Sequence, residues 1–174
     1  FIGGAAIVAS HITKLGSKCE FISLIGSDDP GKWIHKELEK NSVETNLYID
    51  ENRPTTFKKR YLVENQKLFR VSRLDDHMVD KEITKKILDY INKASLNAHG
   101  IVISDFVYGL ISDKLINEII KFAKNRNIKL YGDLQCSSQT GDISRMKNFT
   151  LICPNEREAR ISLQNKDIGL EELC

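Results

Sequence analysis

The order of apolar and polar residues along this chain follows two periods, and these periods predict helices and strands. Apolar residues recur every three or four positions, the spacing of one helix face, in four segments. These helices are expected at 5–15, at 32–40, after Asp80 as far as Ala94, and after Ser112 as far as Ala123. Short apolar runs predict buried strands at 19–25, 46–49, 100–105, 128–134 and 150–153. Strands that alternate with helices form right-handed βαβ units, so the sequence predicts an α/β fold with a mainly parallel sheet.

Residues 55–73 have a different pattern. Two extended runs, 55–63 and 67–73, are joined by Glu64-Asn65-Gln66, which predicts a β-hairpin with a three-residue loop. Strand alternation separates the side chains of the first run into two faces. One face carries Thr56, Lys58 and Arg60, and the other carries Phe57, Lys59, Tyr61 and Val63. A cationic face opposite a mostly apolar one suits a flap over an anionic substrate, and it also fits a solvated edge hairpin with ordinary surface lysines.

The composition is that of a globular protein of one domain, with 174 residues, 41% of them apolar and 29% charged. The 26 basic and 24 acidic residues are spread along the chain and leave a net charge of +2. This balance predicts no nucleic-acid partner and no membrane partner. The four cysteines form no C-x-x-C pair, which argues against a metal site or a disulfide framework and favours a reducing cytoplasm.

Polar residues follow three successive predicted strands. Asp105, Asp133 and Asn155 lie at or just past the ends of these strands, where ligands gather in open α/β sheets. Asn155 is followed by Glu158, and an amide and a carboxylate at this spacing can orient a hydrated magnesium ion. The same spacing is a close variant of the capping box, which satisfies backbone N–H groups at a helix start. The sequence leaves both interpretations open.

Gly3 and Gly4 precede the first predicted helix. Bare backbone at a helix N-terminus can approach a ligand closely and donate N–H bonds to it. A glycine turn that only lets the helix pack closely would have the same sequence. Both interpretations stay open here as well.

The segment F-I-G-G-A-A-I-V-A, residues 1–9, resembles the first signature of the ribokinase-like (PfkB) carbohydrate kinases. The downstream spacing through Leu24–Gly31 also matches, and Pro154–Glu158 is similar to the N-x-x-E motif of that family. Within the family, residues 53–70 resemble the heptose 7-phosphate kinase branch, as does Ser104–Leu110, which falls where that branch has S-D-Y-x-K-G. That branch is often fused to an adenylyltransferase in the ADP-heptose pathway of bacterial lipopolysaccharide.

The resemblance implies a three-layer α/β/α fold with a small β-hairpin lid at about 53–74, and an ATP- and Mg²⁺-dependent sugar kinase. It implies that Asn155 and Glu158 place the metal through water, with Asp133 also on the nucleotide side. The residues expected to bind the sugar or its phosphate are Gly3, Gly4, Lys58, Arg60, Arg70 and Asp105. The lid is further expected to pair with the lid of a second subunit in a homodimer.

The chain departs from the family pattern on the acceptor or phosphate side. Ile7 stands where family members usually carry Asn, Tyr108 replaces the Lys of the branch motif, and Gln135 falls where the branch has Lys. These departures indicate a different sugar or a decayed site. The G-A-G-D motif, which carries the catalytic base of the family, does not occur in residues 1–174. The base is therefore expected beyond Cys174, and this partial kinase domain is expected to be inactive alone.

Two other functions remain open. The chain could belong to a kinase-like protein that binds a sugar or nucleotide without catalysis, which Ile7 favours. It could instead be an unrelated doubly wound nucleotide-binding module. The sequence fixes neither the sugar nor the hydroxyl that is phosphorylated, nor the oligomeric state, nor any fused domain.

Overall fold

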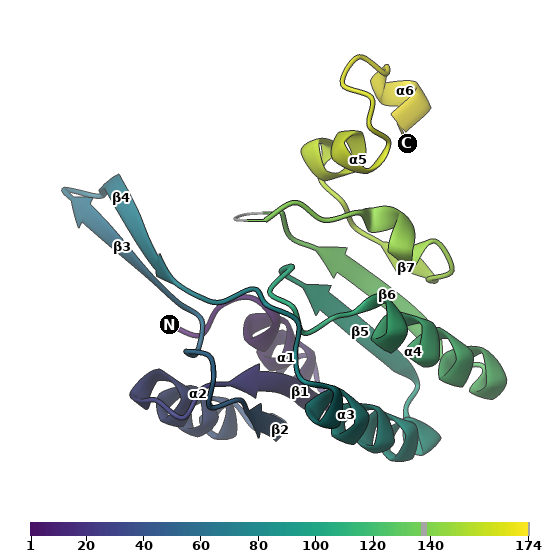
Figure 1. Ribbon diagram of the computed structural model, residues 1–174, viewed down its shortest axis with the longest axis horizontal. Coiled ribbons are helices and arrows are strands. Elements are labelled where there is room, and N and C mark those ends of the chain that lie inside the picture. The colour runs from purple at the N-terminus through teal and green to yellow at the C-terminus, as the bar shows by residue number, and fades with distance from the viewer. Residues whose placement is uncertain (137–138, 174) are drawn as a thin grey trace. The chain divides into compact units, whose positions relative to one another are not determined.

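The chain has the α/β order that the sequence predicts (Figure 1). The computed structural model describes residues 1–136 and 139–173. It divides into two compact units, Phe1–His77 and Met78–Cys174. Each unit has its own parallel strands, so each is described by itself. Among the described residues, no helix is long and apolar enough to cross a membrane.

The first unit is a parallel strand pair with two helices and a hairpin. Its elements are α1 (Ala5–Lys14), β1 (Glu20–Ile25), α2 (Asp29–Lys40), β2 (Glu44–Ile49), β3 (Phe57–Val63) and β4 (Gln66–Arg73). β1 and β2 pair in parallel over their full length. The small core consists of Ala6, Ala9, Leu38 and Val43, with Ile2, Cys19, Phe21 and Ile34 packed against it. Helix α2 begins earlier than predicted, because the Asp28 side chain accepts a bond from the Gly31 N–H and caps it.

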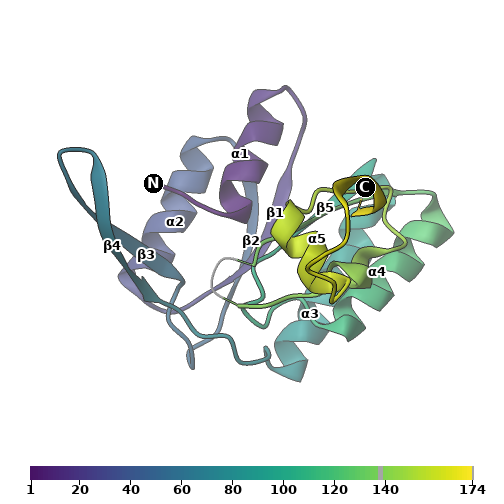
Figure 2. The ribbon, with the colours of Figure 1, turned by 90° about the horizontal axis from the view of Figure 1, so that it is seen from above.

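Strands β3 and β4 form a hairpin, called the lid hairpin after the role expected from its sequence, which projects away from β1, β2 and their helices (Figures 1 and 2). The strands are antiparallel, and Glu64 and Asn65 alone join them. The predicted three-residue loop is wrong, because Gln66 already belongs to β4. Glu64 and Asn65 have φ angles of 47° and 71°. Two successive residues with positive φ are typical of a type I′ turn, whose twist matches that of the flanking strands.

The second unit is a three-stranded parallel sheet with helices. Its elements are α3 (Lys81–Ala94), the 3₁₀ turn η1 (Ser95–Asn97), β5 (Gly100–Asp105), α4 (Asp113–Arg126), β6 (Lys129–Leu134), the 3₁₀ turn η2 (Ile143–Met146), β7 (Leu151–Ile152), α5 (Glu156–Ser162) and α6 (Leu170–Leu173). The strand order is β5-β6-β7. Asp80 and Ser112 cap α3 and α4, as the sequence predicts. The α/β fold class with a mainly parallel sheet is therefore confirmed.

One face of the second sheet is buried, and side chains alternate along β5 and β6. The buried side chains of this unit include Ile87, Ile91, Ile103, Leu115, Ile116, Ile119, Leu130, Leu134 and Met146. Val102 and Tyr131, which pair across β5 and β6, lie on the other face and are 44% and 37% exposed. This alternation decides which strand-end side chains share a face.

Candidate functional site

Asn155 and Glu158 form a reciprocal capping box at the start of α5. The Glu158 N–H donates to Asn155 Oδ1 at 2.9 Å, and the Asn155 N–H donates to Glu158 Oε2 at 3.0 Å. The other oxygen, Glu158 Oε1, accepts the Cys136 N–H at 3.0 Å. Glu158 is only 3% exposed. Its carboxylate therefore joins the segment after β6 to the first turn of α5.

These contacts bear on the predicted magnesium site. Both carboxylate oxygens of Glu158 face backbone N–H groups, and Asn155 Oδ1 faces another. Residues 1–136 and 139–173 contain no group of three His, Cys, Asp or Glu side chains that could hold a metal ion. The residues present thus do not fit a direct ligand set for Mg²⁺. A role through water stays a prediction.

Asp105 ends β5 and Asp133 is the next-to-last residue of β6, but the two face opposite sides of the sheet. Asp133 pairs with Ser104, and Asp105 pairs with Leu134. Because successive side chains of a strand alternate, the two carboxylates leave the sheet on different faces. Asp133 is half-buried and accepts bonds from Gln135 Nε2 at 3.2 and 3.3 Å. The structure therefore does not bring these two candidates to one face.

Asp105 is 2% exposed and holds the loop that follows β5. Its Oδ1 accepts the Val107 N–H at 2.8 Å, and its Oδ2 accepts Arg145 Nη1 at 3.3 Å. Arg145 Nη2 also donates to the Ile111 carbonyl at 2.6 Å. Burial raises the pKa of Asp105 above its ordinary value, although the Val107 N–H and Arg145 oppose the rise. These contacts favour a structural role for Asp105 over direct contact with a sugar.

Arg145 was missed by reasoning from the sequence. It lies in η2, forty positions from Asp105 along the chain, and no motif or period marks it. Its Nε lies 2.7 Å from Asp113 Oδ1, so the guanidinium contacts β5, the loop after it and the start of α4. Only the folded chain shows this partner.

Gly3 and Gly4 precede α1, as the sequence predicts. Gly4 is the N-cap residue and has a φ of 55°, a conformation that residues with a Cβ rarely adopt. A Cβ added at Gly3 would meet no atom of the described residues within 4 Å. Ile7, at the position of the usual family Asn, is 40% exposed. The backbone here is open enough to approach a ligand, but Ile7 offers no hydrogen bond to one.

The cationic face of the lid hairpin consists of Lys58, Arg60 and Arg70. Arg60 lies directly opposite Arg70 across the two strands, and Lys58 lies two positions from Arg60. Like charges in directly opposite positions destabilise a strand pair. Glycine positions 3 and 4 and this face belong to the first unit, whereas the strand-end residues belong to the second. The candidate residues therefore form two groups, one in each unit.

The other face of the lid hairpin, called its apolar face, carries Phe57, Tyr61, Phe69 and Val71 together with Lys59 and Arg73. Tyr61 and Phe69 stack with ring centroids 4.5 Å apart, and the Lys59 ammonium lies 4.9 Å from the centroid of the Tyr61 ring. The four apolar side chains are between 38% and 53% exposed. An exposed group of this size on one strand pair is typical of a contact surface.

Comparison with known proteins adds the family. The model of the pfkB family carbohydrate kinases matches residues 1–173. The chain is 31% identical over 162 residues to the bifunctional protein HldE of Helicobacter hepaticus. This match covers 92% of the chain but 33% of the relative, so the chain spans about a third of that protein's length.

Solved structures show the same fold. Phosphofructokinase-2 from Escherichia coli in complex with fructose-6-phosphate matches 98% of this chain with a TM-score of 0.72, at 16% identity. Ribokinase from Giardia lamblia matches 97% with a TM-score of 0.69, also at 16% identity. The chain covers 55% and 51% of those two structures. The ribokinase-like α/β fold is thereby confirmed.

Proposed function

Because the chain belongs to the pfkB family of carbohydrate kinases, we propose that the complete protein transfers the γ-phosphate of ATP to a sugar phosphate. The observation that carries this choice of acceptor is the cationic face of Lys58, Arg60 and Arg70 on the lid hairpin. The likeness of residues 53–70 to the heptose 7-phosphate kinases favours heptose 7-phosphate as that acceptor. We place the reaction in the cytoplasm.

The charge arrangement supports a phosphorylated acceptor. Arg60 and Arg70 lie opposite each other, so a phosphate dianion bound on this face would meet two guanidinium groups. Arginine binds phosphate oxygens in a bidentate manner, and Lys58 would add a point charge. A lid that closes over the acceptor would also exclude water from the reaction. In this proposal the lid residues bind and orient the acceptor, and the base comes from elsewhere in the protein.

ATP is the phosphate donor that family membership supports. Magnesium normally neutralises charge on the phosphates in such reactions. Asn155 and Glu158 do not offer direct ligands for it, so no step in this proposal depends on where the ion binds. The lid hairpin is further proposed to join two subunits through its apolar face.

Replacing Arg60 tests the acceptor. We expect Arg60→Ala in the complete protein to lower kcat/KM for the sugar phosphate about 10- to 100-fold, because a hydrogen bond to a charged group contributes about 1.5–3 kcal/mol. The unphosphorylated sugar should lose less than about twofold. Lys59→Ala, on the opposite face of the same strand, is the matched control and should change neither value much. Raising the salt concentration should weaken the preference for the phosphorylated sugar.

Measurements with both the sugar phosphate and the unphosphorylated sugar distinguish a kinase from a binding protein without catalysis. Equal losses on both sugars in Arg60→Ala would make the cationic face an ordinary solvated surface. A complete protein that binds the sugar phosphate but releases no ADP would support a binding protein without catalysis. Ile7, which cannot hydrogen-bond a sugar hydroxyl, is the residue that favours this second function.

A further inference from the structure

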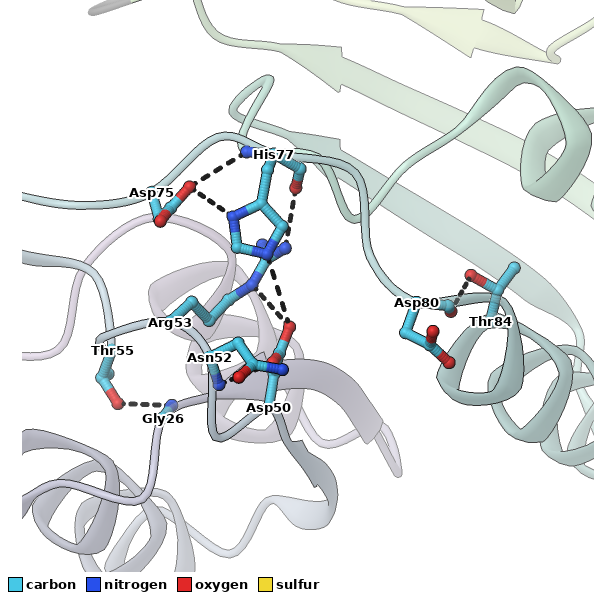
Figure 3. A network of polar contacts seen from close by, with 9 residues as sticks. All are labelled: Gly26, Asp50, Asn52, Arg53, Thr55, Asp75, His77, Asp80 and Thr84. Carbon is cyan, nitrogen blue, oxygen red and sulfur yellow. Dashed lines mark hydrogen bonds and ion pairs between the residues drawn. The ribbon is translucent and has the colours of Figure 1, made fainter.

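A buried arginine connects the two arms of the lid hairpin at its base. The arm that leads from β2 to β3 is residues 50–56, and the arm that leaves β4 is residues 74–77. Arg53 lies in the first arm and is 8% exposed. Its Nε donates to Asp50 Oδ2 at 2.9 Å, and its Nη2 donates to the His77 carbonyl at 2.7 Å (Figure 3). One planar side chain thus bonds to both arms.

Asp50 anchors this arginine to the sheet of the first unit. The residue directly follows β2, and its N–H donates to the Ile25 carbonyl at the end of β1 at 2.9 Å. Its side chain is 6% exposed, with Oδ1 accepting the Asn52 N–H at 3.0 Å. The carboxylate that holds Arg53 therefore has a fixed position relative to β1 and β2.

A second set of contacts holds the first arm against the turn before α2. Thr55 Oγ1 accepts the Gly26 N–H at 2.9 Å, and the Thr55 N–H donates to Asp28 Oδ2 at 3.1 Å. A Cβ at Gly26 would lie 2.5 Å from the Arg53 carbonyl oxygen, so only glycine permits this approach. The first arm is thus held on both sides of Pro54.

The second arm has its own local structure at His77. The His77 N–H donates to Asp75 Oδ1 at 3.1 Å, and the His77 ring nitrogen Nδ1 contacts the same oxygen (Figure 3). His77 Nε2 lies 3.9 Å from Asp50 Oδ2. These contacts fix the direction of the His77 carbonyl that receives Arg53. The bond from Arg53 to this carbonyl therefore links two ordered segments.

We propose that Arg53 is a positioning residue of the lid. By bonding both Asp50 and the His77 carbonyl, it fixes the direction in which β3 and β4 project from β1 and β2, and so the place of the cationic face. A buried ion pair is weak evidence for stability, because desolvation can offset its attraction. The planar guanidinium of Arg53, in contrast, can bond both acceptors only in one arrangement of the two arms. This proposal rests on the proposed function, because the cationic face is what Arg53 would position.

Arg53→Lys in the complete protein is the primary test. Lysine keeps the positive charge beside Asp50 but lacks the planar fork that reaches two acceptors at once. We expect KM for the sugar phosphate to rise about tenfold. This is the effect of losing about one well-placed hydrogen bond between the displaced cationic face and the phosphate. KM for ATP should stay within about twofold of the wild type. A purely structural arginine would instead lower kcat through a smaller folded fraction and leave both KM values unchanged, which would overturn the proposal.

Arg126→Lys is the matched control. Arg126 also connects separate elements, since it donates to the Asn92 carbonyl at 3.0 Å and to the Ser95 hydroxyl, but it lies at the end of α4. It should change neither KM value. Should Arg53→Lys fail to fold, the paired replacement of Asp50→Asn with Arg53→Gln, which removes both buried charges, takes its place with the same measurements.

Coupling to Arg60 tests whether Arg53 acts through the lid. In an Arg60→Ala background, Arg53→Lys should raise KM for the sugar phosphate less than about threefold, because the group that it positions is gone. Fully additive effects would overturn the proposal.

Amide hydrogen exchange separates this proposal from the proposed function. Exchange in β3 and β4 should speed up at least about tenfold in Arg53→Lys and stay unchanged in Arg126→Lys. Unchanged exchange in Arg53→Lys overturns the positioning role, even if the sugar phosphate is confirmed as substrate. If Arg60→Ala lowers kcat/KM equally for both sugars while hairpin exchange speeds up in Arg53→Lys, the acceptor proposal fails and the role of Arg53 in holding the arms stands.

Discussion

The Asp105 carboxyl group is 2% exposed, and burial raises its pKa above the ordinary value of 3.8. A carboxyl group whose pKa is higher in the folded state stabilises the fold below its unfolded pKa. It loses that contribution as the pH rises through the folded pKa. Asp105 therefore makes the folded chain relatively more stable in acid than at neutral pH.

Asp105→Asn tests this sign. The asparagine side chain of this variant would not titrate. We compare the free energy of unfolding of the variant with that of the wild type. The variant's value minus the wild type's should increase as the pH rises from below 3.8 towards neutral, because only the wild type loses stability from this group. The attraction between Arg145 and ionised Asp105 opposes this trend, because the variant loses it only at a pH where Asp105 of the wild type is charged. The measurement is denaturant unfolding across this pH range.

Asp142→Asn provides a control of opposite sign. The Ser144 hydroxyl and N–H lower the pKa of Asp142, so its contribution is present above the unfolded pKa and lost in acid. For Asp142→Asn, the variant's free energy of unfolding minus that of the wild type should therefore decrease as the pH rises. A flat or falling difference for Asp105→Asn would mean that the ion pair with Arg145 outweighs burial.

Glu158 leads to a second prediction. Its two oxygens accept the N–H groups of Cys136 and Asn155, and glutamine has only one oxygen to offer. Glu158→Gln should therefore lower the free energy of unfolding by about 1–3 kcal/mol, the cost of a buried donor left without a partner. Glu171→Gln, an exposed position, should change it by less than about 0.5 kcal/mol. Chemical denaturation of the complete protein measures both.

The metal interpretation of Glu158 predicts a different result. A raised Mg²⁺ requirement for phosphate transfer in Glu158→Gln, without any loss of stability, would favour a role near the ion. Lost stability with an unchanged Mg²⁺ requirement would assign the residue to the capping box alone.

Local spacing offered the Asn155–Glu158 cap as one of two interpretations, because all its atoms come from four consecutive residues. Contacts between distant residues could not be predicted in this way. The Asp105 carboxylate accepts a bond from Arg145, 40 positions away, and the Glu158 carboxylate accepts one from the Cys136 N–H, 22 positions away. A strand-end carboxylate looks the same in sequence whether it faces a ligand or a buried arginine.

At the scale of elements, periodicity predicted the order of the helices and strands, and caps predicted where α3 and α4 begin. The hairpin loop was predicted one residue too long, because Asn65 tolerates positive φ and no third residue is needed. The opposite faces of Asp105 and Asp133 follow from strand register, which the sequence does not state. Register depends on pairing between β5 and β6, and not on either strand alone.

The apolar face of the lid hairpin gives the next prediction. Val71 is 51% exposed and lies directly opposite Lys59. Val71→Glu would place a charge in the proposed subunit contact, while Lys59 could pair with it within one hairpin. If the complete protein forms the proposed dimer, we expect Val71→Glu to raise its dissociation constant at least about tenfold, since a desolvated charge at an interface costs several kcal/mol. Analytical ultracentrifugation over a concentration series measures this.

Leu96→Glu is the control for that experiment, because Leu96 is 67% exposed and lies outside the hairpin. It should leave the dimer unchanged. A wild-type protein that stays monomeric over the whole series would contradict the proposed subunit contact. So would an unchanged dissociation constant in Val71→Glu.

At the scale of the whole molecule, the family model matches residues 1–173, while the chain spans about a third of the HldE relative's length. The sequence identified the family through the order of its motifs. It could not state how the chain divides into compact units, because that depends on which residues pack together. Phe1–His77 carries the lid, and Met78–Cys174 carries the strand ends.

Phosphate transfer needs a base within hydrogen-bond reach of the attacking hydroxyl. Among the described strand-end carboxylates, Asp105 is buried against Arg145, and Glu158 accepts two backbone N–H groups. Asp133 accepts bonds from the Gln135 amide at both of its oxygens. Each of these three carboxylates thus already accepts hydrogen bonds from the protein itself.

We therefore expect residues 1–174 alone to release no ADP in the presence of ATP, Mg²⁺ and a sugar phosphate. A coupled ADP assay on the purified chain checks this, with the complete protein as the positive control. Circular dichroism of the same sample shows whether the chain is folded, so that an unfolded sample is not counted as support. Sugar-dependent ADP release above the blank would contradict the expectation. If Asp105→Asn then abolished that release, the raised pKa of Asp105 would belong to a working base, and the loop around Arg145 would have to open during turnover.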